Sequence, residues 1–382
     1  MKKLIAAALA LALLGSGAVF AADNEAVSTA APAAVLMECS TGTVLYAKGE
    51  SERRAPASVT KVMTLLLAAE AIDSGALSLD DTVTASERAA SMGGSQIWLE
   101  PGETMTVSEM IKCIAVVSAN DCAVALAEHI AGSESAFVQR MNERAAELGL
   151  QNTHFTNCTG LFDDSEHYTS ALDLAVMSRE LLSHDWITDY TTIWMDSIRS
   201  GEFGLSNTNK LLRSLPGCNG LKTGWTHIAG YCVAASAERD GTQYIAVIMG
   251  AESSESRNAD AAALIEYGFA SWKLCPALDS ALPPVRVNGG TVDSVQPDIA
   301  GVRDVLLPSA DAASLERSID LPESVNAPVA AGDRLGTLTL SAGGDVVAEI
   351  PLVAISDAPR LSSPGVLLKM LGLLFSLPLS ST

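Results

Sequence analysis

The sequence has few of the residue patterns that hold a metal ion or a redox centre. Its five histidines form no HxxxH or HExxH pair, and its seven cysteines form no CxxC pair. We therefore expect no metal and no cofactor. We expect most cysteines to be small apolar core residues. One or two disulfides stay open as an alternative, because the cysteines are odd in number and scattered, at Cys39, Cys113, Cys122, Cys158, Cys218, Cys232 and Cys275.

Positive charge is also scarce. The chain has 24 Lys and Arg against 45 Asp and Glu, a formal net charge of −21. Such a chain repels a phosphate backbone, so we expect no nucleic-acid partner. Aromatic residues make up only 5% of the sequence, but 48% of the residues are apolar and 18% charged, as in ordinary folded proteins. The 382 residues suffice for two or three domains and a substantial core.

The N-terminal apolar segment is too short to span a membrane. It covers about residues 4–14, between the pair Lys2 and Lys3 and the small residues Ala21 and Ala22, whereas a span needs about 20 residues. This order is typical of an export signal. We predict a cleaved signal peptide at residues 1–21 and a mature protein outside the cytoplasm, with a retained anchor as the alternative.

A serine and a lysine lie three residues apart at the start of a helical pattern. Pro56 precedes Ser58 and Lys61, apolar residues recur at helical spacing up to Ala71, and Gly75 is a stop signal. Residues i and i+3 of a helix share a face. Ser58 and Lys61 are therefore neighbours, a hydroxyl nucleophile beside a base. The alternative is a solvated helix N-terminus, because an SxxK tetrapeptide is expected about once by chance in a chain of this length.

Ser118 and Asn120 lie between two further helical patterns, at residues 107–117 and 123–130. Polar side chains on a short loop between helices can converge on a cleft. The alternative is that Asn120 caps the next helix, and the local pattern by itself favours this cap. Farther along the chain, His167 ends a polar connection, where we expect it to anchor the loop rather than to catalyse.

Lys222, Thr223 and Gly224 lie on or just before a strand that a turn joins to another strand. The turn signal is Asp-Gly at residues 240–241. A lysine beside a glycine in a strand is commonly an exposed edge charge. Alternatively, Gly224 lets a ligand approach the backbone closely.

Together the three motifs resemble the active-site set of penicillin-binding proteins and serine β-lactamases, with SxxK at residues 58–61, SxN at 118–120 and KTG at 222–224. The flanking sequence more narrowly resembles exported low-molecular-mass D-alanyl-D-alanine carboxypeptidases. The resemblance covers about residues 30–360 and implies an α+β fold. This fold has a β-lactamase/transpeptidase-like catalytic domain, in which an antiparallel sheet carries helices on both faces and a helical subdomain, followed by a small all-β sandwich.

The resemblance also implies a mechanism. Lys61, kept neutral by burial and nearby positive charge, takes the proton of Ser58 as its Oγ attacks a peptide carbonyl. The backbone N–H groups of Ser58 and Trp225 hold the oxyanion. Ser118 passes the proton to the leaving amine, and water then releases the shortened peptide.

The implied substrate is the peptidoglycan stem peptide that ends in D-Ala-D-Ala. Asn120 would bind the substrate amide, while Lys222 and Thr223 would bind the terminal carboxylate. Gly224 and Trp225 complete the expected substrate-binding residues. β-Lactams would acylate Ser58 as mimics of this substrate.

The sequence departs from the family pattern at two positions, and two other functions are alternatives to this prediction. Trp225 follows KTG, where relatives often have histidine or a small residue, and Thr208 stands where many relatives have an arginine. A class A β-lactamase would need an ExxxN-like segment, and no Glu between residues 121 and 221 is followed four residues later by Asn. A catalytically silent peptidoglycan-binding wall or sporulation protein would have no need of both Ser58 and Lys61.

The chain divides, by prediction, into a signal peptide at 1–21, a catalytic domain at 22–275, a β-sandwich at 276–360 and a terminal helix at 361–382. A composition change at residues 276–284 marks the main boundary. The last apolar stretch, residues 365–377, spans only about 20 Å as a helix, which suits an in-plane membrane anchor. A helix packed on the core is the alternative. We thus expect an exported enzyme at the outer face of the cytoplasmic membrane, with the membrane surface as a partner.

Overall fold

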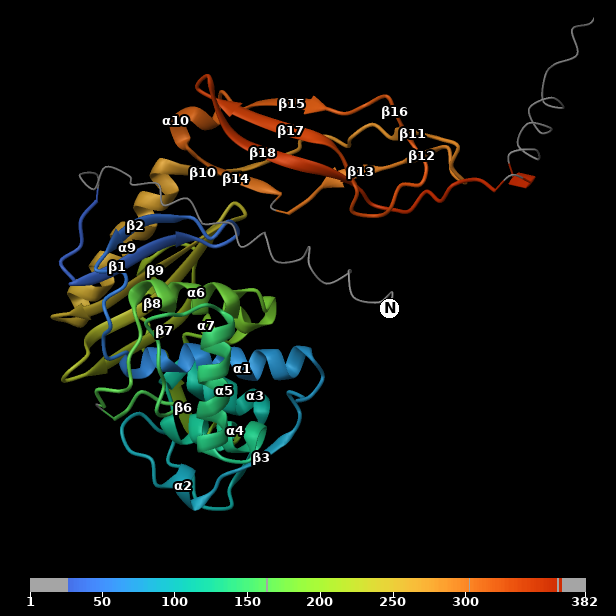
Figure 1. The fold of residues 1–382 in the computed structure, drawn as a ribbon. Coiled ribbons are helices and arrows are strands. Elements are labelled where there is room, and N and C mark those ends of the chain that lie inside the picture. The colour runs from blue at the N-terminus through green and yellow to red at the C-terminus, as the bar shows by residue number, and fades with distance from the viewer. Residues whose placement is uncertain (1–26, 163, 302, 363, 366–382) are drawn as a thin grey trace, which may run out of the picture. The chain divides into compact units, whose positions relative to one another are not determined.

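The computed structural model of the protein describes residues 27–162, 164–301, 303–362 and 364–365. The chain forms two compact units, divided between Ala270 and Ser271 (Figure 1). The predicted signal peptide and residues 366–382 of the predicted anchor lie outside the described residues. Within the described ranges, no helix is both long and apolar enough to cross a membrane.

A five-stranded antiparallel sheet forms the centre of the first unit, with the strand order β2-β1-β9-β8-β7. The predicted Asp240-Gly241 turn joins β8 to β9, and both of its residues have positive φ, 50° and 76°. The strands are β1 (Ala33–Glu38), β2 (Val44–Lys48), β7 (Cys218–Thr226), β8 (Gly230–Arg239) and β9 (Thr242–Ala251).

Helices cover both faces of this sheet, because alternate strand residues point to opposite sides. Ile245, Val247 and Met249 of β9 join the main apolar core, to which α1 (Lys61–Asp73) and α6 (Ala171–Leu182) contribute. Tyr244 points the other way and meets Phe269 of α9 (Ser254–Ser271) edge-on, with ring centroids 4.9 Å apart. The predicted architecture of the catalytic domain is confirmed (Figure 1).

A helical subdomain carries the SxN segment. Its α3 begins with the capping box that Thr106 and Glu109 predict, in which each side chain accepts the backbone N–H of the other. The helices are α2 (Glu87–Ala90), α3 (Val107–Val117), α4 (Asn120–Ala131) and α5 (Glu134–Glu147). Short elements complete the unit: β3 (Thr82–Thr84), β4 (Thr104–Thr106), η2 (Asp185–Ile187), α7 (Thr188–Thr191), β5 (Met195–Ile198), η3 (Arg199–Gly201), β6 (Phe203–Ser206) and α8 (Leu211–Ser214).

All seven cysteines are free thiols, and five of them are buried. The prediction that most cysteines serve as small core residues is therefore confirmed. The alternative of one or two disulfides is wrong for this structure.

In the part of the second unit that the structure describes, strands predominate, and α10 is a short helix among them. Its strands β13, β18, β17 and β15 form one sheet, and β12, β11 and β16 form another. Val285 of β11 shares a core with Leu335 of β17 and Ala354 of β18, so the two sheets pack together as a sandwich. The elements are β10 (Trp272–Pro276), β11 (Val285–Asn288), β12 (Ser294–Val295), β13 (Pro297–Ile299), β14 (Asp304–Pro308), α10 (Ser309–Ala312), β15 (Glu316–Asp320), β16 (Ser324–Asn326), β17 (Arg334–Ala342) and β18 (Asp345–Ala354).

Candidate active site

Ser58 lies in a tight turn that feeds directly into a helix. The 3₁₀ turn η1 (Ala57–Thr60) precedes α1, so the predicted helix is present, with its first turn wound more tightly. Ala57 has a φ of 50°, a left-handed conformation that is uncommon for alanine. Ser58 therefore lies between a residue in the left-handed conformation, Ala57, and the start of the right-handed helix α1.

Lys61 is a buried amine beside that hydroxyl. Its side chain has no exposed surface, and its Nζ lies 3.1 Å from Ser58 Oγ, 2.6 Å from Asn120 Oδ1 and 2.8 Å from the Thr159 carbonyl oxygen. Burial disfavours the ammonium form and lowers the pKa of Lys61 to about 7. The oxygens of Asn120 and Thr159 can only accept hydrogen bonds, so a neutral Lys61 keeps its lone pair for the Ser58 hydroxyl.

Ser118 and Asn120 occupy the break between α3 and α4. Ser118 ends α3 in the left-handed conformation, with φ 63°, and its Oγ is buried without a hydrogen-bond partner among the described residues. Asn120 does not cap α4, since that helix has no side-chain cap hydrogen bond. The cap that the local pattern favours is therefore wrong. Asn120 instead links Lys61 to the Gly93 carbonyl, to which its Nδ2 donates at 2.8 Å.

Lys222 lies on β7, an edge strand of the sheet, yet only 1% of it is exposed. The exposed-edge alternative is therefore wrong. Its Nζ donates to the Thr223 carbonyl at 2.8 Å. Burial, together with the nearby charges of Lys61 and Arg257, holds the pKa of Lys222 well below its ordinary value. An anion beside this amine would favour its ammonium form.

Gly224 is the point at which β7 meets the Ser58 turn. A Cβ at this position would lie 2.9 Å from the backbone nitrogens of Ser58 and Val59 and 3.0 Å from the Pro56 oxygen. Only glycine fits such a close approach. The next residue, Trp225, turns its side chain outward, with 56% of it exposed and its ring 5.9 Å from that of Tyr231. The Trp225 indole thus lies at the protein surface.

Thr208 contacts the site although the sequence singled it out only as a departure from the family. Its hydroxyl lies 2.7 Å from that of Thr223. Two nearly buried asparagines hold this segment in place: Asn207 donates to the Ile193 carbonyl at 2.8 Å, and Asn209 donates to the Gly220 carbonyl of β7 at 3.0 Å. The Asn-x-Asn spacing around Thr208 was the available signal.

Thr159 was missed altogether, because its backbone carbonyl rather than its side chain contacts Lys61. His167 anchors its loop as predicted. Its Nδ1 accepts the Thr156 N–H at 3.0 Å, so Nε2 carries the proton and donates to Thr60 Oγ1 at 2.8 Å. Burial lowers the pKa of His167 to about 4, so the ring is neutral at physiological pH. It joins the polar connection to the turn that bears Ser58.

The structure thus brings three distant segments together around Ser58. Lys61 and Asn120 share a hydrogen bond, and Gly224 touches the Ser58 backbone. A hydroxyl beside an amine with a pKa of about 7 is an arrangement suited to covalent acyl transfer. Among the described residues, no group of three or more His, Cys, Asp or Glu side chains is arranged to hold a metal ion.

Comparison with known proteins identifies the family of the chain. The family profile described as D-alanyl-D-alanine carboxypeptidase matches residues 19–253, and that of the C-terminal domain of penicillin-binding protein 5 matches residues 279–360. The chain is 43% identical over 336 residues to D-alanyl-D-alanine carboxypeptidase DacF of Bacillus subtilis, covering 86% of each chain. It is 33% identical to DacD of Escherichia coli, covering 93% of this chain and 94% of DacD.

Solved structures of penicillin-binding proteins are also similar to this chain. Penicillin-binding protein 5 of Haemophilus influenzae is 28% identical and superposes with a TM-score of 0.76 over 87% of this chain and 99% of that one. Penicillin-binding protein 6B of Escherichia coli is 31% identical, with a TM-score of 0.70 over 86% of this chain and 96% of that one. The predicted family, fold class and enzyme class are confirmed. The chain belongs to the peptidase S11 family of D-alanyl-D-alanine carboxypeptidases.

Proposed function

We propose that the protein removes the terminal D-alanine of peptidoglycan stem peptides through an acyl-enzyme on Ser58. The observation that carries this proposal is the buried Lys61 Nζ, 3.1 Å from Ser58 Oγ, with acceptor oxygens on two other sides. An amine with a pKa of about 7 is partly neutral at physiological pH and can act as a general base there.

In the proposed acylation, Ser58 Oγ forms a bond to the carbonyl carbon of the penultimate D-alanine while Lys61 takes the hydroxyl proton. The C–N bond then breaks, and the proton reaches the leaving amine through Ser118. The unpartnered Ser118 Oγ supports this relay, because a buried hydroxyl without a partner is free to bridge donor and acceptor. Water attacks the ester in the second half of the reaction, which frees Ser58 and the shortened peptide.

The backbone N–H groups of Ser58 and Trp225 are the proposed oxyanion hole. The absence of a side chain at Gly224 supports it, since β7 packs directly against the Ser58 turn at the residue that precedes Trp225. Each donor of this kind is worth about 3–4 kcal/mol of transition-state stabilisation.

We propose that Lys222 and Thr223 bind the substrate carboxylate. We propose that Asn120 binds the substrate amide. An arriving carboxylate favours the ammonium form of Lys222, and that new charge in turn favours the neutral form of Lys61. The Thr208 hydroxyl belongs to the same site. Because it pairs with Thr223 at 2.7 Å, one hydroxyl of the pair has a proton left for the carboxylate. A pocket built for a free carboxylate restricts cleavage to the C-terminal residue.

We also propose that the enzyme is exported and lies at the outer face of the cytoplasmic membrane, held by the terminal helix at residues 361–382, and that β-lactams acylate Ser58. The sequence pattern at residues 1–21 supports export. The domain limits of 22–275 and 276–360 stay predictions; the unit division after Ala270 and the family matches to 19–253 and 279–360 lie near them.

The test is incubation of the protein with penicillin, followed by intact mass measurement and then by a peptide ending in D-Ala-D-Ala. We expect one penicillin mass on the wild type, none on Ser58→Ala, and D-alanine release by the wild type only. Ser74→Ala, which changes an exposed serine at the end of α1, is the matched control and should behave as wild type. A penicillin adduct without D-alanine release would favour the silent-binder alternative.

A further inference from the structure

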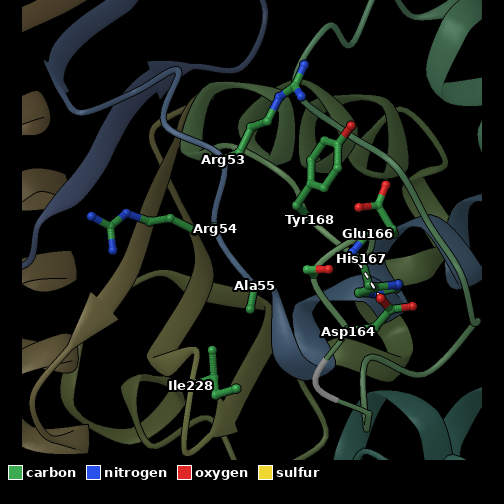
Figure 2. Close-up of a pocket in the computed structure, with 9 residues that line it drawn as sticks. Arg53, Arg54, Ala55, Asp164, Glu166, His167, Tyr168 and Ile228 are labelled. Atoms are coloured by element: carbon green, nitrogen blue, oxygen red, sulfur yellow. Dashed lines mark hydrogen bonds between the residues drawn. The ribbon is translucent and has the colours of Figure 1, made fainter.

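A pocket of about 540 Å³ lies between two loops of the first unit. Residues 98 and 100–103 line it from the chain between α2 and β4, and Arg199 lines it from η3. We call it the Trp98 pocket. Among the described residues, none lines both this pocket and the one beside the Ser58 turn, whose wall includes Ile228 (Figure 2).

Three residues at or beside this pocket have a backbone conformation that side chains rarely adopt. Trp98, Arg199 and Ser200 have φ angles of 56°, 52° and 56°, in the left-handed region, where a bulky residue such as tryptophan is an outlier. The other non-glycine residues with positive φ, among those described, lie in the Ser58 turn, the SxN segment and the β8–β9 turn. Residues in such costly conformations cluster at functional sites. The cluster around Trp98 therefore indicates a second functional region of the first unit.

Asp121 anchors the backbone on both sides of Trp98. Its Oδ2 accepts the backbone N–H of Ile97 at 3.0 Å and that of Leu99 at 3.1 Å. Both of these neighbours are buried, whereas Trp98 is 64% exposed. Asp121 follows Asn120 in α4. The indole is therefore held out of the fold by the segment that carries Asn120 of the proposed site.

Contacts behind the indole keep it in one place. Its ring meets Phe203 of β6 edge-on, with the centroids 5.8 Å apart. Arg199 joins the two loops, because its guanidinium donates to both Glu103 oxygens, at 2.8 and 3.0 Å, and to the Ile97 carbonyl at 2.9 Å. Trp98 thus presents a fixed aromatic surface to solvent.

The chemistry of the pocket favours a neutral ligand that carries hydroxyl or amide groups. Glu100 is exposed, and among the described residues its side chain forms no ion pair and no hydrogen bond. The charge of Arg199 is already paired with Glu103. An anionic ligand would therefore meet an unpaired carboxylate and, among the residues that line this pocket, no free cation. A sugar ring fits instead, because its C–H face packs on an indole and its hydroxyl groups donate to a carboxylate.

We propose that the Trp98 pocket binds the glycan strand of peptidoglycan, with an N-acetylated amino sugar stacked on the Trp98 indole and a sugar hydroxyl donating to Glu100. This step rests on the proposed function, because the stem peptides are attached to that strand. The loop is tied to the residue after Asn120, so a strand held at Trp98 keeps stem peptides close to Ser58. The pocket therefore favours a polymeric substrate over a free peptide.

The first experiment measures sugar binding by NMR of the indole N–H groups. The chain has five tryptophans, and the signal of Trp98 is the one that Trp98→Asn removes. Asparagine adopts the left-handed conformation readily, so this change removes the ring without adding strain. On titration of the wild type with tetra-N-acetylchitotetraose we expect the Trp98 signal to shift. Calorimetry should give a Kd about tenfold higher for Trp98→Asn and about five-fold higher for Glu100→Ala.

The second experiment compares D-alanine release from isolated peptidoglycan with release from a soluble peptide ending in D-Ala-D-Ala. The ratio of the two kcat/KM values should fall about five-fold in Trp98→Asn, because only the polymer has sugars for the pocket. Ile355→Asn, which removes a 57% exposed apolar side chain from the second unit, is the matched control and should keep the wild-type ratio and Kd.

A Trp98 signal that does not shift, or the same Kd for the wild type and Trp98→Asn, would overturn the proposal. So would an unchanged kcat/KM ratio, or Trp98-dependent binding to phosphatidylglycerol vesicles in place of the sugar. Failure of the proposed function gives a different result. The wild type would then release no D-alanine from either substrate, while the titration with tetra-N-acetylchitotetraose would still measure sugar binding at Trp98.

Discussion

The two units of the chain treat polar residues in opposite ways. Among the described residues, every buried polar or charged side chain lies in the first unit, and the last of them along the chain is Asp260. They include Lys61, Asn120 and Lys222 of the proposed site. The buried side chains that the structure describes in the second unit are all apolar, as in the cluster around Leu338 and Leu352.

This difference shows where the chain tolerates a stability cost. Burying an amine costs free energy, which the hydrogen bonds of Lys61 and Lys222 offset only in part. The proposed reaction gives a reason for the burial of Lys61 and Lys222, because it needs both amines in the site. The buried side chains that the structure describes in the second unit contribute apolar packing. Changes in the two units should therefore separate activity from stability.

The largest expected effect lies in the second unit and concerns stability alone. Leu338→Ala removes a fully buried side chain of β17 and should lower the free energy of unfolding of that unit by about 2–5 kcal/mol. Penicillin acylation measured well below the unfolding transition should stay at the wild-type rate. Urea unfolding measures the change in the free energy of unfolding, and acylation kinetics measure the rate of penicillin acylation. Val347→Ala, at a position 41% exposed, is the control and should change little. Loss of acylation in folded Leu338→Ala would break the comparison.

The next effect lies in the first unit and concerns protonation. Because the pKa of Lys61 is about 7, the rate constant of penicillin acylation should rise about tenfold per pH unit from pH 5 to pH 7 and then level off. A stopped-flow profile from pH 5 to pH 9 checks this. A profile that is flat over this range, or one that still rises at pH 9, would contradict the role of Lys61 as the base.

Stability should respond to the same group with a defined sign. The folded pKa of Lys61 lies below the unfolded value of 10.5, so the unfolded chain binds more protons between about pH 7 and 10.5. Lys61 therefore makes the free energy of unfolding rise with pH across that window. The stability gained in this way is present above pH 10.5 and is lost as the pH falls to about 7.

The smallest effect sharpens the account of the carboxylate site. Thr208→Val keeps the side-chain shape but removes the hydroxyl that pairs with Thr223. We expect kcat/KM for a peptide with a free C-terminal carboxylate to fall about five-fold, since a hydrogen bond is worth roughly 1 kcal/mol. Penicillin acylation, which also needs a carboxylate, should fall similarly. Thr84→Val on the exposed face of β3 is the control. An unchanged kcat/KM would remove Thr208 from the site.

Local patterns in the sequence predicted much of this structure. The helix after Ser58, the capping box at Thr106 and the Asp-Gly hairpin all depend on residues within a few positions of one another. The cap assigned to Asn120 was wrong for the same reason. The helix pattern around it contains no sign of Lys61, which lies 59 residues earlier and binds its side chain.

What the sequence by itself determined is the set of reactive groups and their family. A hydroxyl and an amine at i and i+3 on a helix are neighbours whatever surrounds them. Only the tertiary structure decided which groups the amine meets and how readily it loses its proton. The Thr159 carbonyl, the Thr208 hydroxyl and the burial of Lys61 all arise from contacts between distant segments. The pKa of a side chain depends on the groups around it in space, and the residues next to it in the sequence do not determine those groups.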